Sequence, residues 1–212
     1  PKRQSSDSGK TLKGSLSIMR IIGSTDAGFK PLLSEILKRG EQDTTLVEEA
    51  VKEIIAAVKA RGDKALVEYT KRCDKTDIKG SIEVSRAEAE KALRSVSKSD
   101  LDLMRLAANR IESFHKKQIE NSWFTTEADG TILGSRVTPL QRAGIYVPGG
   151  KAAYPSTVLM NAIPAKVAGV DEVIMVTPPG KDGLNPHVLA AAHLAGVDRI
   201  FRVGGAQAIA AL

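Results

Sequence analysis

The final third of the chain alternates between short apolar runs and helix-like segments, and this alternation limits the possible folds more than any other feature. Three runs typical of strands, AGIYV, EVIMVT and RIFRV, are separated by two helical stretches that end at Gly169 and Gly196. Ser156 is predicted to cap the first helix, and Asn185 with Pro186 stands where the second should begin. Strands joined by helices in this way run parallel with right-handed crossovers. We therefore predict a parallel α/β sheet whose ligands bind beyond the carboxyl ends of its strands.

The first half of the chain reads as helical. Thr45 with Glu48, and Ser85 with Glu88, match the capping-box pattern that marks the start of a helix. A polar break at Gly62 separates the helix after Thr45 from a second one. These helices carry no pattern that indicates chemistry by itself.

Apolar spacing predicts which helix faces point into a core. The predicted stripes are Leu66, Tyr69 and Thr70 in the helix after Gly62, and Leu103, Ala107, Ile111 and Phe114 in a longer helix after Ser99. Pro164 falls inside the first helix of the alternating region, so we expect a kink or an early break there.

The segment from Asn121 to Pro139 changes to the period of a hairpin. Asp129-Gly130 lies between two runs of strand type, and this dipeptide supplies the positive φ angles of a tight turn. We predict strands near 122–128 and 131–138.

The net charge of +6 raises the question of nucleic-acid binding. Half of this excess lies in residues 1–18, where four basic residues face one acidic residue, and this Ser/Gly/Lys-rich tail is expected to be disordered. Basic and acidic residues alternate elsewhere, and aromatic residues for base stacking are scarce. We therefore expect no nucleic-acid partner. Apolar runs long enough for a membrane span are absent, and we expect a cytoplasmic protein with no membrane partner.

Two glycine pairs lie at the predicted carboxyl edge of the sheet. Gly149-Gly150 follows the first strand and Gly204-Gly205 follows the third, with Tyr146 and Gln207 beside them. Glycines let a ligand approach the backbone closely, and a helix start there would offer free N–H groups. The same glycines could equally serve only to turn the chain, and both interpretations stay open. The usual dinucleotide fingerprint G-x-G-x-x-G is missing.

The histidines and the cysteine do not form a recognisable site in the sequence. His187 and His193 are six residues apart, which does not place them on one helix face, and His115 is predicted to be solvated. Cys73 is predicted to be a half-buried thiol on a helix rather than a nucleophile. We therefore predict no catalytic residue and no metal ligand from the residues alone.

The stretch RAGIYVPGGKAAYPSTVLMNAIPAKVAGVDEVIMVTPP, followed by LAGVDRIFRVGGAQAIAAL, resembles the signature region of histidinol dehydrogenases. ARGDKALVEYTKRCDK and AANRIESFHKKQ are similar to the helical arm of the same family. The resemblance covers about residues 19–212, and it identifies the chain as the amino-terminal half of such an enzyme.

This resemblance implies a zinc-dependent homodimer that oxidises L-histidinol to L-histidine in two NAD-linked steps. It also implies that Tyr146 and Gln207 contact NAD. The family's zinc ligands and its proton-transferring glutamate and histidine would lie beyond Leu212. We therefore expect the chain by itself to be inactive and to lack a specific zinc site.

The predicted fold class is α/β, an incomplete Rossmann-like βαβαβ unit preceded by a helical arm and a β-hairpin. The predicted division is a disordered basic tail at 1–18, a helical arm at 19–120, a hairpin linker at 121–139, and the first part of an NAD-binding domain at 140–212. The alternative is a noncatalytic α/β scaffold in which the helical arm is a dimerisation surface.

Overall fold

The computed structural model describes residues 22–38, 44–78, 80–149, 153–180 and 183–212. The chain divides into two compact units, residues 1–46 and 47–212. In the first unit, α1 (Phe29–Lys38) has no buried residue among its ten. The tail predicted at residues 1–18 lies outside the described part of the chain.

The second unit contains the alternating elements that the sequence predicts. Its elements in chain order are α2 (Thr45–Arg61, from Val47 on), α3 (Asp63–Cys73), α4 (Arg86–Ser95), α5 (Lys98–His115), the 3-10 helix η1 (Lys116–Gln118), β1 (Trp123–Thr126), β2 (Ile132–Ser135), β3 (Arg142–Tyr146), α6 (Pro155–Val167), β4 (Glu172–Val176), α7 (Pro186–Leu194), β5 (Arg199–Phe201) and α8 (Gly205–Ala211).

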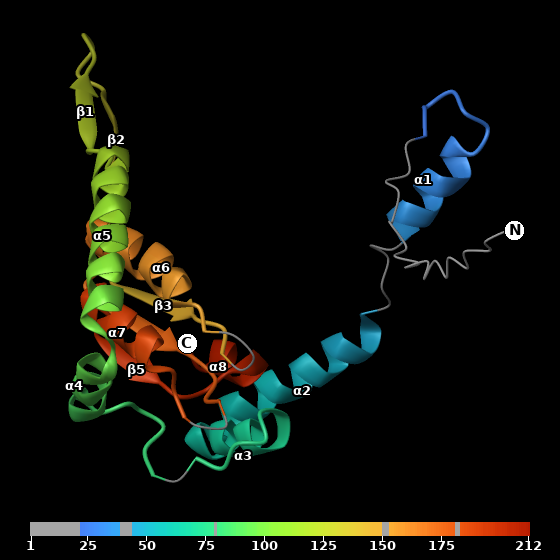
Figure 1. Cartoon of the computed structure of the whole chain (residues 1–212). Coiled ribbons are helices and arrows are strands. Elements are labelled where there is room, and N and C mark those ends of the chain that lie inside the picture. Colours follow the sequence, from blue (N-terminus) through green and yellow to red (C-terminus); the bar gives the residue numbers. More distant parts are fainter. Residues whose placement is uncertain (1–21, 39–43, 79, 150–152, 181–182) are drawn as a thin grey trace, which may run out of the picture. The chain divides into compact units, whose positions relative to one another are not determined.

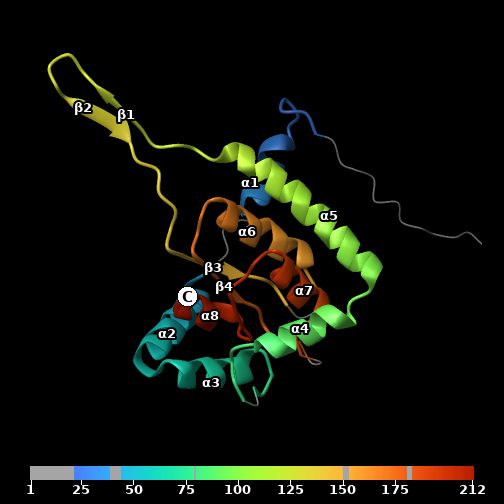
Figure 2. The same ribbon diagram turned by 90° about the vertical axis from the view of Figure 1, so that its left-hand side faces the viewer.

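The centre of this unit is a parallel sheet in the order β3-β4-β5. Because side chains alternate along a strand, each strand contributes to two different cores. Ile145, Val173 and Met175 lie in the core beneath α6 and α7, whereas Tyr146 and Val176 lie on the opposite face. Figures 1 and 2 show α6 and α7 on one side of the sheet and α8 on the other. The predicted α/β class with parallel strands is confirmed.

The larger core lies between the sheet and the α6–α7 layer. Both helices are rich in small and branched apolar residues, and α5 and α4 pack against them from outside. The fully enclosed members from the two helices are Val158, Leu159, Ala162, Val188, Leu189, Ala190, Ala191 and Ala192. The alanines let α7 approach α4 and α6 closely, which accounts for the burial of its central residues 188–192.

The other face of the sheet is covered by α8. Ala208 packs with Val176 and Val203 on its sheet side, while Ala206 and Ala210 pack against α2 and α3. The helix α8 is therefore held between the sheet and the α2–α3 pair, and this position controls where its first turn lies. The predicted domain boundaries stay a prediction.

The two crossover helices end in the same way. AGVDEV at 168–173 and AGVDRI at 195–200 repeat one pattern, in which Gly169 and Gly196 adopt φ angles of 88° and 73°. The next residue in each repeat donates its N–H to a carbonyl five residues earlier, which is the Schellman closure. Both predicted helix ends are therefore confirmed with a local cause.

The outer edge of β5 is also paired. The segment around Glu83 runs antiparallel to β5, with Val84 N–H donating to the Ile200 carbonyl and Arg202 N–H donating to the Ile82 carbonyl. The guanidinium of Arg199 binds the Glu83 carboxylate through two bonds of 2.8 and 2.9 Å. This pairing protects the β5 edge from association with another strand.

The helix boundaries agree with the predicted signals at some positions and differ at others. Asn185 caps α7 through its side-chain oxygen, as predicted. Ser85 accepts from Glu88 N–H, but the Glu88 carboxylate binds Arg202 at 2.6 Å. The prediction for Ser156 was wrong, because α6 begins at Pro155 with Tyr154 as its N-cap. An early break at Pro164 was also wrong, since α6 continues to Val167.

The predicted stripe on α5 was wrong in part. Leu103 and Phe114 are 65% and 61% exposed, whereas Met104 is the buried residue of this helix. Leu101, Ala107, Ala108 and Ile111 complete the face that packs on α6 and α7. Both stripes are apolar, so only the position of the neighbouring helices could decide between them. In α3, by contrast, the predicted Leu66, Tyr69 and Thr70 are all buried.

The hairpin is confirmed with shorter strands than predicted. Within the hairpin turn, Gly130 is the one residue with a positive φ, 88°. The turn closes through a hydrogen bond from Gly130 N–H to the Glu127 carbonyl. The Asp129 carboxylate accepts a hydrogen bond of 2.9 Å from Thr131 N–H. Asp129 therefore stabilises the turn through its side chain and not by adopting a positive φ angle.

Asp198 connects the end of α6 to two strands. Its Oδ2 accepts from Lys166 Nζ and from Val173 N–H, both at 2.6 Å. Burial by itself raises the pKa of this carboxyl, but the Lys166 and Val173 hydrogen bonds outweigh it, and the pKa lies below its ordinary value.

We predict that Asp198→Asn lowers the free energy of unfolding by about 1 kcal/mol at neutral pH, because the ion pair is lost. Since the pKa is depressed in the folded state, this stabilisation is present above the ordinary aspartate pKa and disappears as pH falls through the depressed value. Urea unfolding at several pH values measures it. Asp171→Asn, at the equivalent place in the repeat, is the control and should behave like the unaltered chain. If the unfolding free energies of Asp198→Asn and the unaltered chain still differ at low pH, the hydrogen bonds of the Asp198 carboxylate are not the cause of the difference.

Candidate functional site

The carboxyl ends of the three strands meet around Pro178. A Cβ at Gly149 would lie 2.3 Å from the Pro178 carbonyl oxygen, and a Cβ at Gly204 would lie 2.4 Å from the Pro178 Cβ. Gly149 follows β3, Pro178 follows β4 and Gly204 follows β5, so residues from all three strand ends are in contact. Both glycines therefore have a packing reason, whereas the sequence left a chain turn and a ligand site equally open.

Tyr146 lies at this edge on the α8 face of the sheet. Its ring is half-buried against Val176, Val203 and Ala208. Its hydroxyl oxygen accepts a hydrogen bond of 3.2 Å from Gly205 N–H in the first turn of α8. This bond joins the end of β3 to the start of α8. The phenolic O–H proton is left available as a donor, because the hydroxyl acts in this bond as acceptor.

Gln207 is the second predicted residue at the same place. It is 1% exposed, and its side-chain Nε2 has no hydrogen-bond partner among the described residues. A Cβ at Gly205 would lie 2.6 Å from the Gln207 Oε1, so the carboxamide lies against the Gly205 Cα. A buried amide donor without an acceptor costs about 1–3 kcal/mol, and among the described residues Thr70 Oγ1, Asp74 Oδ2 and Arg202 Nε are buried without a partner in the same way.

The structure thus brings Tyr146 and Gln207 to a common element, the first turn of α8. The ring of Tyr146 offers an apolar face, and the Gln207 amide offers an unused donor. These properties fit a planar, polar ligand such as a dinucleotide. Sequence reasoning missed Pro178, although a proline directly after the second predicted strand was an available signal, and it named Gly205 only as one of a glycine pair.

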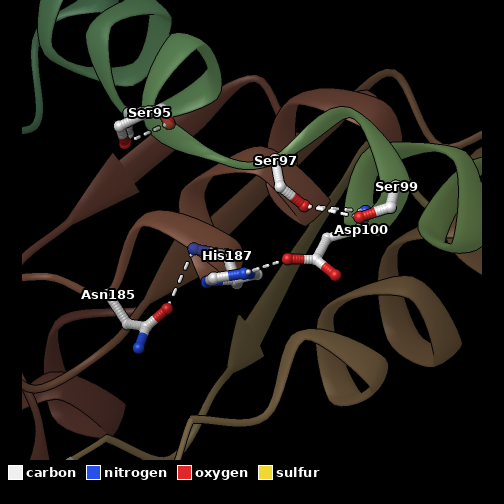
Figure 3. A network of polar contacts seen from close by, with 7 residues as sticks. Ser95, Ser97, Ser99, Asp100, Asn185 and His187 are labelled. Atoms are coloured by element: carbon white, nitrogen blue, oxygen red, sulfur yellow. Dashed lines mark hydrogen bonds and ion pairs between the residues drawn. The ribbon is translucent and has the colours of Figure 1, made fainter.

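His187 forms a hydrogen-bond network instead of a ligand cluster. Its Nε2 lies 3.2 Å from Asp100 Oδ2, and Asn185 Oδ1 accepts from His187 N–H (Figure 3). Asp100 is in the first turn of α5 and His187 is in the first turn of α7. The carboxylate therefore lies near two helix amino termini, where negative charge is favourable. The network connects α5 to α7.

The remaining candidates are placed away from this edge. His115 Nδ1 lies 2.6 Å from Gln118 Oε1, and His193 is exposed on α7. Cys73 ends α3 and is exposed rather than half-buried. No group of three or more His, Cys, Asp or Glu residues in the described ranges could hold a metal ion. The described residues therefore do not fit a zinc site, and no step is assigned to a metal.

Two hollows lie near the opposite, amino edge of the sheet. One is bordered by Lys116 and Lys166, and these cations are paired with Glu112 and Asp198 at 2.6 Å each. The other is lined mainly by apolar residues near Leu140 and Pro164. Both lysines that border the first hollow are therefore already paired, and the second hollow is mainly apolar with Glu120 in its lining. Among the described residues, no helix is both long and apolar enough to cross a membrane.

We predict that Gly204→Ala lowers the free energy of unfolding by about 2–3 kcal/mol, because the added methyl group overlaps a rigid proline ring. Its φ of −135° causes no backbone strain, so only the lack of space is tested. Adding Pro178→Gly, which removes the proline Cβ that lies 2.4 Å from the added methyl group, should recover part of the loss in urea unfolding. If the losses of unfolding free energy at positions 204 and 178 are strictly additive, contact with Pro178 is not what excludes a side chain at position 204.

The His187 hydrogen bond lowers the pKa of Asp100, with a further contribution from Ser97. Asp100→Asn should therefore lower the thermal midpoint at neutral pH, and the loss should vanish as pH falls through the depressed pKa. Asp102→Asn, on the same helix and paired with Arg105, is the matched control. Equal pH profiles for the two variants would rule out a special role for the Asp100–His187 pair.

Comparison with known proteins agrees with this geometry. A sequence model described as histidinol dehydrogenase matches residues 37–212. The histidinol dehydrogenase of Syntrophotalea carbinolica is 54% identical over 196 residues, which is 92% of this chain and 46% of that protein. The Geobacter sulfurreducens protein is 50% identical with the same coverage.

A solved structure is also similar. The crystal structure of histidinol dehydrogenase from Elizabethkingia anophelis superposes with a TM-score of 0.74 at 37% identity, and the match covers 80% of this chain and 39% of that one. The chain spans less than half the length of the curated relatives that it matches. By sequence and by structure, the chain belongs to the histidinol dehydrogenase family.

Proposed function

We propose that this chain contributes the NAD-contacting part of an enzyme that oxidises L-histidinol to L-histidine. Its family membership supports the oxidoreductase class and a role in histidine biosynthesis. The observation that carries the proposal is that Tyr146 and Gln207, far apart in sequence, meet at Gly205. In this role they bind and orient the cofactor at the carboxyl edge of the sheet.

The sheet supports a Rossmann-like arrangement as part of this proposal. The helices α6 and α7 cover one face and α8 covers the other, which is the layering of a doubly wound fold. In such folds the ligand lies at the carboxyl edge of the strands, where Tyr146 ends β3. The missing glycine fingerprint is consistent with the packing role of Gly149 and Gly204 against Pro178.

The chain's own side chains have limited but specific tasks in this proposal. The Tyr146 ring provides an apolar surface for a planar group, and its O–H can donate to the ligand while Gly205 N–H keeps it in position. The Gln207 Nε2 donates to an acceptor of the cofactor, which satisfies an otherwise unpaired buried group. When bound at these residues, NAD would supply the hydride acceptor for the oxidation.

The assembly is proposed from the family as well. We propose a cytoplasmic homodimer that uses zinc in catalysis. The described residues contain no cluster that could hold the metal, so other residues would be its ligands. L-histidinol is the proposed substrate. The competing proposal is a scaffold without cofactor affinity, and the exposed Leu103 and Phe114 of α5 favour it as a contact surface.

Titration of the 15N-labelled chain with NAD distinguishes these proposals. We expect amide shifts confined to the residues around Gly205 and the end of β3. Tyr146→Phe and Gln207→Ala should each raise the dissociation constant by about 3–10 fold, the value of one hydrogen bond. Gln118→Ala is the control, since that carboxamide binds His115 elsewhere.

The same titration can also exclude NAD binding at this edge. If millimolar NAD causes no localised shifts in a folded chain, the scaffold proposal is preferred. If NAD binds but the two variants bind as well as the unaltered chain, the site lies elsewhere.

A further inference from the structure

The first turn of α8 contains Gly205, whose positive φ and missing side chain the proposed function does not explain. Gly205 has a φ of 65°, a conformation that residues with a Cβ seldom adopt. Its neighbour Gly204 is explained by the Pro178 ring, but that contact does not explain why the second glycine is needed. The Gly205 N–H bonds to the Tyr146 hydroxyl, and the three atoms nearest to a Cβ added at Gly205 all belong to Gln207.

The Gln207 carboxamide occupies the space next to the Gly205 Cα. A Cβ there would lie 2.6 Å from Oε1, 3.2 Å from Cδ and 3.3 Å from Nε2. All three atoms of the amide group are therefore within the range where a side chain at 205 would displace them. Gln207 itself is 1% exposed, so the displaced amide has little room to move elsewhere.

The backbone of Gly205 fixes the other group. Its N–H donates to the Tyr146 hydroxyl at 3.2 Å, so the same residue determines the position of the phenol oxygen. The rest of the surroundings is rigid, because α8 is packed on the sheet through Ala208 and on α3 through Ala206 and Ala210. One residue thus contacts both polar groups through different atoms.

We propose that Gly205 is a positioning residue, whose missing side chain and N–H hold the Gln207 amide and the Tyr146 hydroxyl in register for one dinucleotide. This inference rests on the proposed function. It explains the unpaired Nε2 of Gln207, since a donor held in place in advance loses little freedom when the ligand's acceptor arrives. It also explains why Gly205 adopts a conformation that excludes most residues.

The key variant is Gly205→Asn. Asparagine tolerates the left-handed conformation better than other residues with a side chain, so the backbone is retained while its Cβ still meets the Gln207 amide. Gly130→Ala is the control, because Gly130 also has a positive φ, 88°, but nothing lies within 4 Å of its added Cβ. It should lower stability and leave NAD affinity unchanged.

Affinities for NAD are measured by calorimetry or NMR for the unaltered chain, Gly205→Asn, Gln207→Ala and the double variant. We expect Gly205→Asn to raise the dissociation constant about tenfold, and the double variant to bind no more weakly than Gln207→Ala alone. A purely structural role of Gly205 would instead give additive losses. Additive losses, or an unchanged affinity of Gly205→Asn, would overturn the inference and leave the proposed function standing.

Two measurements without NAD keep the tests independent. In Gly205→Asn the side-chain amide resonances of Gln207 should move, and in Tyr146→Phe the Gly205 amide should exchange faster with solvent. If the unaltered chain does not bind NAD, the proposed function fails by itself. Unchanged Gln207 resonances and unchanged Gly205 exchange would then refute the positioning geometry as well.

Discussion

The contact of Pro178 with Gly149 and Gly204 is the constraint on which the candidate site depends. Each glycine would bring a Cβ within 2.4 Å of the proline residue if it carried a side chain. The three strand ends can approach each other only because these side chains are absent. Their approach places the start of α8 above the end of β3, which makes the bond from Gly205 N–H to the Tyr146 hydroxyl possible. Close packing of the strand ends and the proposed ligand site therefore use the same edge of the sheet, with different glycines for each.

The polar interactions of this chain divide into those that hold the fold and those that remain open. Asp198, Arg199 and Asp100 have their hydrogen bonds satisfied by residues from other elements, and they connect helices to strands or to each other. Gln207 differs from them, because its buried Nε2 has no partner among the described residues. An unsatisfied buried donor is unfavourable by itself, and its position at the carboxyl edge is consistent with the proposed ligand contact, although Thr70, Asp74 and Arg202 also contain such atoms.

Much of the fold was predictable because its signals are local. The Gly169 and Gly196 helix ends, the Asn185 cap and the alternation of strands and helices all follow from short-range patterns. The α5 stripe was not predictable in full, since Leu103 and Met104 both belong to apolar faces and only the packed helices choose between them. The same holds for Glu88, whose carboxylate binds Arg202 instead of completing a capping box. The sequence analysis placed Tyr146 and Gln207 beside the glycine pairs at the predicted carboxyl edge, and only the resemblance suggested that both contact NAD. Their contacts with Gly205 depend on the folded structure.

The sequence by itself determined the order and type of the elements, the ends of both crossover helices and the family of the chain. These features depend on hydrogen bonds and φ angles within a few residues, or on motifs that can be compared directly. The tertiary structure alone decided that Gly204 accommodates Pro178, that the Gln207 amide lies against Gly205, and that Tyr146 reaches α8. Such contacts join residues 26 to 59 positions apart, or depend on how a buried side chain is enclosed, and the chain must fold before they exist.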